Sequence, residues 1–158
     1  MKVKYTINDE VKEFDIKEGE VLLDVLRRYG YTEVKGNCYM GTCGACAVLV
    51  NGTPRTSCTT LAAQVDGATI TTVKGIGTIT NPSPLQTAFV EKGAVQCGFC
   101  TPGTIVSAYA LLQKNLNPTE EEIKKSIDGN LCRCTGYVQQ IEAIKYAAQL
   151  MKGGKKDE

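Results

Sequence analysis

The stretch Gln96-Cys97-Gly98-Phe99-Cys100-Thr101-Pro102-Gly103 predicts the organisation of the second half of this chain. Two cysteines separated by two residues are followed at once by helix-start signals. Thr101 is a favourable N-cap, and Pro102 suits the first helical position. A second pair, Cys132-Arg133-Cys134, comes after a predicted helix that can fold back on the first. Four thiols brought together between helices indicate a metal site.

Helical signals continue on both sides of that stretch. The capping boxes at 83–86 and 119–122 each predict the start of a helix. We expect helices over about 84–92, 101–115, 120–128 and 138–151. No strand signal interrupts them, so the second half is predicted to be all-α.

The first half has a different pattern. Residues 2–8 and 11–16 alternate polar with apolar side chains, as in an antiparallel hairpin. A helical apolar stripe then ends at Gly30, and Asn51-Gly52 predicts a tight hairpin turn. Residues 68–73 supply a last strand. These signals predict a small sheet packed on one helix.

Composition excludes several classes of function. The chain has 158 residues and a net charge of +1, with basic and acidic residues well mixed. This balance argues against a nucleic-acid partner or an anionic membrane partner. No apolar stretch approaches the roughly 18 residues that span a bilayer. The first residues read as a strand and not as a signal peptide, which favours a cytoplasmic location.

Eight cysteines and no histidine define the metal chemistry that is open to the chain. Disulfides are disfavoured because the cytosol keeps thiols reduced. Without histidine, any metal must be held largely by thiolate.

The first cysteine set has the plant-type ferredoxin spacing of a [2Fe–2S] cluster. Cys38, Cys43 and Cys46 follow C-x4-C-x2-C, and eleven residues separate Cys46 from Cys58. Gly41 and Gly44 would let the backbone approach the cluster and adopt positive φ. The alternatives are a structural zinc, or Cys58 as an ordinary core thiol.

The second set does not have that spacing. By geometry alone, its four thiols could hold zinc or an iron–sulfur cluster about equally well. The first set favours a second cluster, because two clusters in one small chain form an electron-transfer wire. The members of this set are Cys97, Cys100, Cys132 and Cys134.

These motifs, together with Gly129-Asn130-Leu131-Cys132-Arg133-Cys134-Thr135-Gly136-Tyr137, closely resemble the small iron–sulfur subunit of the molybdenum hydroxylases. That family includes xanthine dehydrogenase, aldehyde oxidoreductase and aerobic carbon monoxide dehydrogenase. The resemblance runs from about residue 3 to residue 150.

The resemblance implies an α+β fold: an N-terminal β-grasp, plant-type ferredoxin-like domain followed by an all-α four-helix domain. We expect these domains at 1–76 and 84–152, joined by a linker at 77–83 and followed by a flexible tail at 153–158. Each domain would hold one [2Fe–2S] cluster. The helical-domain cluster would lie nearest the molybdenum–pterin dinucleotide, and Gln96 matches the glutamine that hydrogen-bonds the pterin.

The partners that the resemblance implies are a large molybdopterin-binding subunit and a medium FAD-binding subunit, assembled as a dimer of heterotrimers. The expected role is electron transfer between them, with no substrate-binding or acid–base residue on this chain. A free-standing two-cluster carrier and a zinc-stabilised adaptor are the alternatives. The substrate stays open among purines, aldehydes, N-heterocycles, aromatic thioesters and carbon monoxide.

The chain departs from the family pattern at one place. Where the family reads Gly-Cys-x-Glu-Gly, this sequence reads Asn37-Cys38-Tyr39-Met40-Gly41. Asn37 tolerates the left-handed conformation that glycine would adopt, so the loop can be kept. Met40 removes a negative charge beside the cluster, which is expected to make that cluster easier to reduce.

Overall fold

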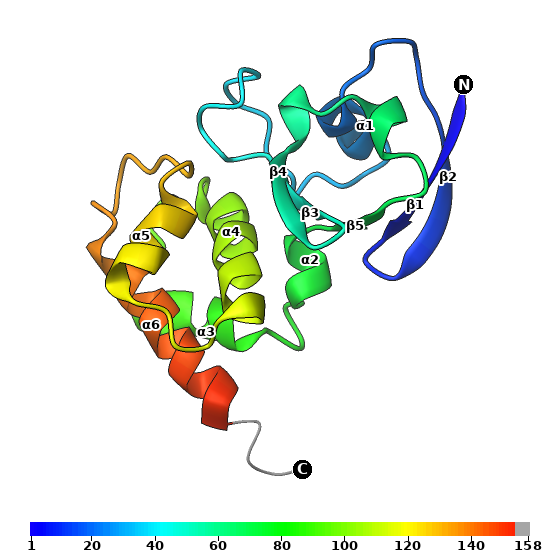
Figure 1. Ribbon diagram of the computed structural model, residues 1–158. Coiled ribbons are helices and arrows are strands. Elements are labelled where there is room, and N and C mark those ends of the chain that lie inside the picture. Colours follow the sequence, from blue (N-terminus) through cyan, green and yellow to red (C-terminus); the bar gives the residue numbers. More distant parts are fainter. Residues whose placement is uncertain (154–158) are drawn as a thin grey trace.

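The computed structural model describes residues 1–153, which form a mixed sheet covered by one short helix and followed by further helices (Figure 1). The predicted tail at 153–158 lies outside the described residues, except for Gly153, which is still helical. The strands are β1 (Lys2–Ile7), β2 (Glu10–Asp15), β3 (Ala47–Val50), β4 (Thr53–Thr56) and β5 (Thr69–Thr71). The helices are α1 (Leu22–Arg28), α2 (Val73–Ile76), α3 (Pro84–Glu91), α4 (Thr101–Lys114), α5 (Glu120–Ile127) and α6 (Val138–Gly153).

The sheet has the strand order β2-β1-β5-β3-β4. β1 pairs antiparallel with β2 and parallel with β5, while β3 pairs antiparallel with both β5 and β4. Both predicted hairpins are confirmed. At the second one, Asn51 and Gly52 have φ of 49° and 76°, which suits the type I′ turn that the Asn-Gly pair predicts.

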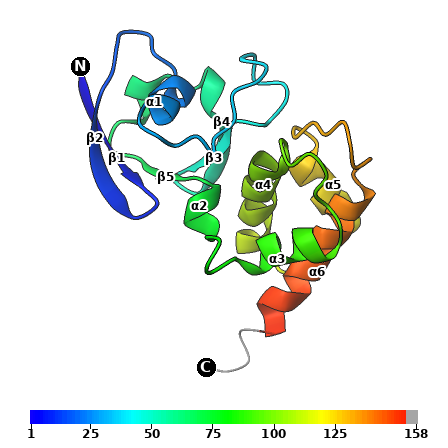
Figure 2. The same cartoon turned by 180° about the vertical axis from the view of Figure 1, so that it is seen from behind.

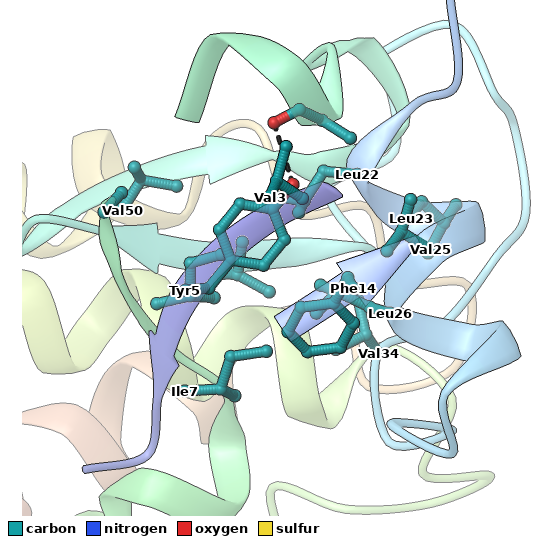
Figure 3. Packing of buried hydrophobic residues seen from close by; sticks show 14 of the residues in the cluster. Val3, Tyr5, Ile7, Phe14, Leu22, Leu23, Val25, Leu26, Val34 and Val50 are labelled. Atoms are coloured by element: carbon teal, nitrogen blue, oxygen red, sulfur yellow. Dashed lines mark hydrogen bonds between the residues drawn. The ribbon is translucent and has the colours of Figure 1, made fainter. Parts of the chain in front are cut away.

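The core of the first half lies between the sheet and α1 (Figure 3). Alternation along β1 buries Val3, Tyr5 and Ile7, each at most 2% exposed, and Tyr5 lies against Phe14 with ring centroids 5.1 Å apart. The apolar stripe of α1 meets this face. Full burial of such a side chain contributes roughly 1.5–3 kcal/mol, so this stripe is the main reason that α1 is held on the sheet.

The helices of the second half have their own core, in which α3 packs on α6 and α4 packs on α5. The capping boxes at Ser83 and Thr119 are both present, as predicted. The prediction for Thr101 is wrong, because the helix begins one residue earlier: Cys100 is the N-cap and Thr101 is the first helical residue. The carbonyl of Cys100 already accepts hydrogen bonds from the backbone and side chain of Thr104.

The two halves are joined by a third apolar cluster between β3 and α4. Ala47 and Leu49 point from the sheet toward Val106 and Ala110, which explains why β3 is buried on both faces. The short helix α2, which the sequence did not predict, also packs on α4. Figures 1 and 2 show α4 beside the sheet from both sides.

Among residues 1–153, every helix falls short of the length and apolar character that crossing a membrane requires.

Candidate metal centres

The first cysteine loop runs from the end of α1 to β3, and Cys58 joins it from the short 3₁₀ turn that follows β4. Gly41 and Gly44 have φ of +75° and +68°, as expected for a loop that curls tightly. The left-handed conformation expected at Asn37 lies instead at Tyr39, with φ of 54°. The loop therefore contains a left-handed residue, but this residue follows Cys38 and does not precede it.

The four thiols of the first set lie in two contacting pairs. Cys38 contacts Cys43, and Cys58 contacts Cys46. The backbone amide of Met40, 3.4 Å from the Cys38 sulfur, is the main cause that lowers the pKa of that thiol to about 5. Burial raises the pKa of Cys58 to about 11. The surroundings of Cys38 therefore favour its thiolate form, whereas burial of Cys58 favours its neutral thiol.

The second set is brought together by two segments: the loop that leads into α4 and ends at the N-cap Cys100, and the loop before α6. It also forms two pairs, Cys100 with Cys132 and Cys97 with Cys134. Burial raises the pKa of Cys100 to about 11. Burial acts in the same direction on Cys132, but the hydroxyl and amide of Thr135 outweigh it and lower that pKa to about 7.

The donor set limits the metals that these thiols can bind. A structural zinc needs four ligands around one ion, whereas a [2Fe–2S] cluster takes two thiolates on each of two irons. All eight cysteines are free thiols, four to a set, and within each set they interact most closely in two pairs. Each set therefore fits one [2Fe–2S] cluster, and the donor set by itself fits one zinc ion equally well.

The two cysteine loops contact each other directly. The amide of Leu131 donates to the carbonyl of Cys43 at 2.9 Å, and the side chain of Asn130 donates to the carbonyl of Gly44 at 3.1 Å. Asn130 is only 4% exposed. In Figures 1 and 2, the cyan loop before β3 and the orange loop before α6 lie at the same end of the molecule. Cys43 of one set is thus hydrogen-bonded to Leu131, the residue beside Cys132 of the other set.

Sequence reasoning missed this contact between the loops. Asn130 and Gly103 lie in the quoted motifs, but their partners lie in the other half of the chain. A Cβ atom at Gly103 would come 2.2 Å from the carbonyl oxygen of Gly44, so the two backbones meet where only glycine fits. The only signals in the sequence were a polar residue, Asn130, in a loop and a glycine, Gly103, in the first turn of a helix.

The surface around the second set is unusually apolar. Cys97 and Cys134 are exposed, and Gln96 is exposed beside them. Four large apolar side chains within four residues of these cysteines in the sequence are also solvent-exposed, namely Val95, Phe99, Leu131 and Val138. Exposed apolar side chains that gather on one surface mark interaction sites.

Comparisons with known proteins agree with this geometry. Residues 5–71 match a family described as "2Fe-2S iron-sulfur cluster binding domain", and residues 72–145 match one described as "[2Fe-2S] binding domain". The chain is 48% identical to the nicotinate dehydrogenase small FeS subunit of Eubacterium barkeri, covering 93% of this chain and 94% of that protein.

The chain belongs to the iron–sulfur subunits of the molybdenum hydroxylases. It is the electron-transferring component of a heteromeric oxidoreductase, with two [2Fe–2S] clusters.

Solved members of this family have the same fold. Quinoline 2-oxidoreductase from Pseudomonas putida 86 contains a chain that superposes with a TM-score of 0.92 at 39% identity, covering 98% of this chain and 97% of that one. Aldehyde oxidoreductase from Desulfovibrio gigas superposes with a TM-score of 0.94 at 41% identity. This chain is covered to 99% in that comparison but spans only 18% of the longer protein.

Proposed function

We propose that this chain carries electrons from a molybdenum–pterin dinucleotide on a large partner subunit to FAD on a medium partner subunit. One [2Fe–2S] cluster would be held by Cys38, Cys43, Cys46 and Cys58, and the other by Cys97, Cys100, Cys132 and Cys134. The observation that carries the proposal is the bonded contact between the loops of two paired thiol sets. When bound, the clusters supply one-electron chemistry, and the chain contributes their position, burial and potentials.

The surfaces support the order of transfer in this proposal. Two thiols of the second set and the adjacent Gln96 are exposed, and exposed apolar residues flank them in the sequence, as a cluster that docks against a pterin-bearing partner requires. We place the amide of Gln96 against the pterin, since an amide can both donate and accept. The first set would then face the flavin subunit through the exposed side chains of Tyr39 and Met40.

The finer architecture is also part of the proposal. We infer that residues 1–76 are a β-grasp ferredoxin-like domain, because α1 packs across a mixed sheet in which β1 and β5 run parallel. Residues 84–152 would be a four-helix cluster-binding domain, with 77–83 as the linker. The assembly would be a dimer of heterotrimers in the cytoplasm.

Substrate choice is assigned to the molybdenum-bearing partner. Three proteins similar to this chain are named for nicotinate, quinoline and aldehyde, although the iron–sulfur unit is alike in all of them. This unit therefore does not determine the substrate.

Metal content tests the proposal. The native complex is expected to contain about four iron atoms and four acid-labile sulfides per copy of this chain, since each set would hold one [2Fe–2S] cluster. Metal and sulfide assays on the purified complex provide the measurement. Stoichiometric zinc without inorganic sulfide would contradict the assignment of both sets.

Met40→Glu is expected to lower the potential of the first cluster slightly, because a negative neighbour opposes the added electron. At about 8 Å, Coulomb's law gives roughly 2 kcal/mol at an effective dielectric of 20 but only about 0.5 kcal/mol in water. The side chain is 72% exposed, so the water value applies, which is on the order of 20 mV for a one-electron couple.

A redox titration followed by EPR measures this shift. Val11→Glu on the edge strand β2 is the matched control, since Val11 is also 72% exposed and the change in charge is the same. A rise in the potential, or an equal shift in the control, would show that Met40 does not lie beside the cluster.

A further inference from the structure

One buried amide next to the second thiol set has no role in the fold described above. Gln140, in the first turn of α6, is 0% exposed. Its Nε2 group donates to the sulfur of Cys100 at 3.6 Å. Its Oε1 atom is also buried and has no hydrogen-bond partner among the described residues.

Stability does not account for an amide at this position. A buried carbonyl oxygen without a partner costs free energy, because it has lost water and gained nothing in return. An apolar side chain of similar size would avoid that cost, and the α6 residues that enter the core beside it, Ala143 and Ile144, are apolar. The one hydrogen bond that the amide makes with the described residues is the one to the Cys100 sulfur.

We propose that Gln140 raises the reduction potential of the cluster held by the second set, by donating its N–H to the Cys100 sulfur. Reduction adds one electron from the molybdenum side, and part of that negative charge falls on the ligand sulfurs. A hydrogen-bond donor to such a sulfur stabilises the reduced cluster more than the oxidised one. This inference rests on the proposed function, since Cys100 must be a ligand.

Burial makes the effect specific to this sulfur. The exposed thiols of the set, Cys97 and Cys134, can take hydrogen bonds from water or a partner, whereas Cys100 is only partly exposed and the Gln140 side chain that donates to it is fully buried. A donor held in a buried setting has a stronger electrostatic effect than one in water. Gln140 therefore offers Cys100 a fixed donor that solvent does not displace.

The test compares Gln140→Met with the control Gln139→Met, in which the neighbouring exposed glutamine is changed in the same way. Both variants are purified as the native complex, and each cluster is titrated by EPR. Gln140→Met is expected to shift the one-electron equilibrium of the second cluster about tenfold toward the oxidised form, a fall of about 59 mV. The first cluster and the control are expected to be unchanged, and the melting temperature is expected to stay equal or rise.

The possible outcomes separate this inference from the proposed function. Zinc in place of iron in the unchanged complex would contradict the proposed function itself. Both clusters present but no fall in potential would overturn the role of Gln140 alone. If Gln140→Met failed to assemble, Gln140→Leu would be titrated in its place. Loss of the second cluster in both variants would assign Gln140 a structural role and also overturn the inference.

Discussion

Gly44→Ala is expected to separate the two cysteine loops. A Cβ atom at this position would lie 2.2 Å from the carbonyl oxygen of Gly129 and 2.6 Å from the side-chain nitrogen of Asn130. Both distances are far below contact, and one of the atoms is backbone, so the loops must move apart. The hydrogen bonds from Asn130 and Leu131 to the first loop would then be lost.

The cost is expected to be about 4–7 kcal/mol in the free energy of unfolding. A left-handed residue other than glycine costs roughly 1–2 kcal/mol, overpacking costs roughly 1–3, and each of the two lost hydrogen bonds costs about 1. Urea denaturation of the purified protein provides the measurement. The slope of the transition is expected to change as well if the halves unfold separately.

Gly52→Ala is the matched control for this change. Gly52 has φ of +76°, so it carries the same conformational cost, but nothing lies within 4 Å of its Cβ position. It is expected to cost only about 1–2 kcal/mol. An equal loss in both variants would show that the contact between the loops contributes nothing to stability.

Cys100→Ser and Cys43→Ser are expected to interrupt the electron path at different points. Under the proposed order, Cys100→Ser damages the cluster nearest the molybdenum, so electrons from substrate reach neither the first cluster nor the flavin. Cys43→Ser leaves substrate able to reduce the second cluster but prevents reduction of the flavin. The backbone carbonyl of Cys43, which Leu131 binds, is retained in that variant.

Anaerobic mixing with substrate, followed by EPR and flavin absorbance, measures both effects. The two variants control for each other, since each removes one thiol from one set. If Cys43→Ser blocked reduction of both clusters in a folded complex, the order of transfer would be the reverse of the one proposed.

The sequence predicted the elements more reliably than the contacts between them. Period-two alternation in β1 and the capping boxes at Ser83 and Thr119 depend on neighbouring residues, so they can be read locally. The helix α2 was missed because its four residues include Gly75, which weakens the helical signal. The start of α4 was placed one residue late, because Thr101 has the stronger capping side chain although Cys100 holds the position.

The candidate sites show the same division. Cysteine spacing predicts which thiols form each set, and the structure places thiols of the same set close together in pairs. Their role as the ligands of two clusters stays a prediction. Gln140 and Asn130 were not predicted, because a glutamine in a helix or an asparagine in a loop is usually an exposed polar residue. Their significance comes from burial and from partners in distant segments, which spacing does not encode.

The contact between the loops also determines at which point of translation the fold can be completed. Gly44 and Asn130 are 86 residues apart in sequence. The first half of the chain, with its own core, can fold as soon as β5 has left the ribosome. The distance between the two metal sites is fixed only after Leu131 has emerged, because its amide completes the bond to Cys43. The arrangement of the two metal sites relative to each other is therefore among the last features of the chain to form. A chain truncated before residue 130 would keep only the first cysteine set complete.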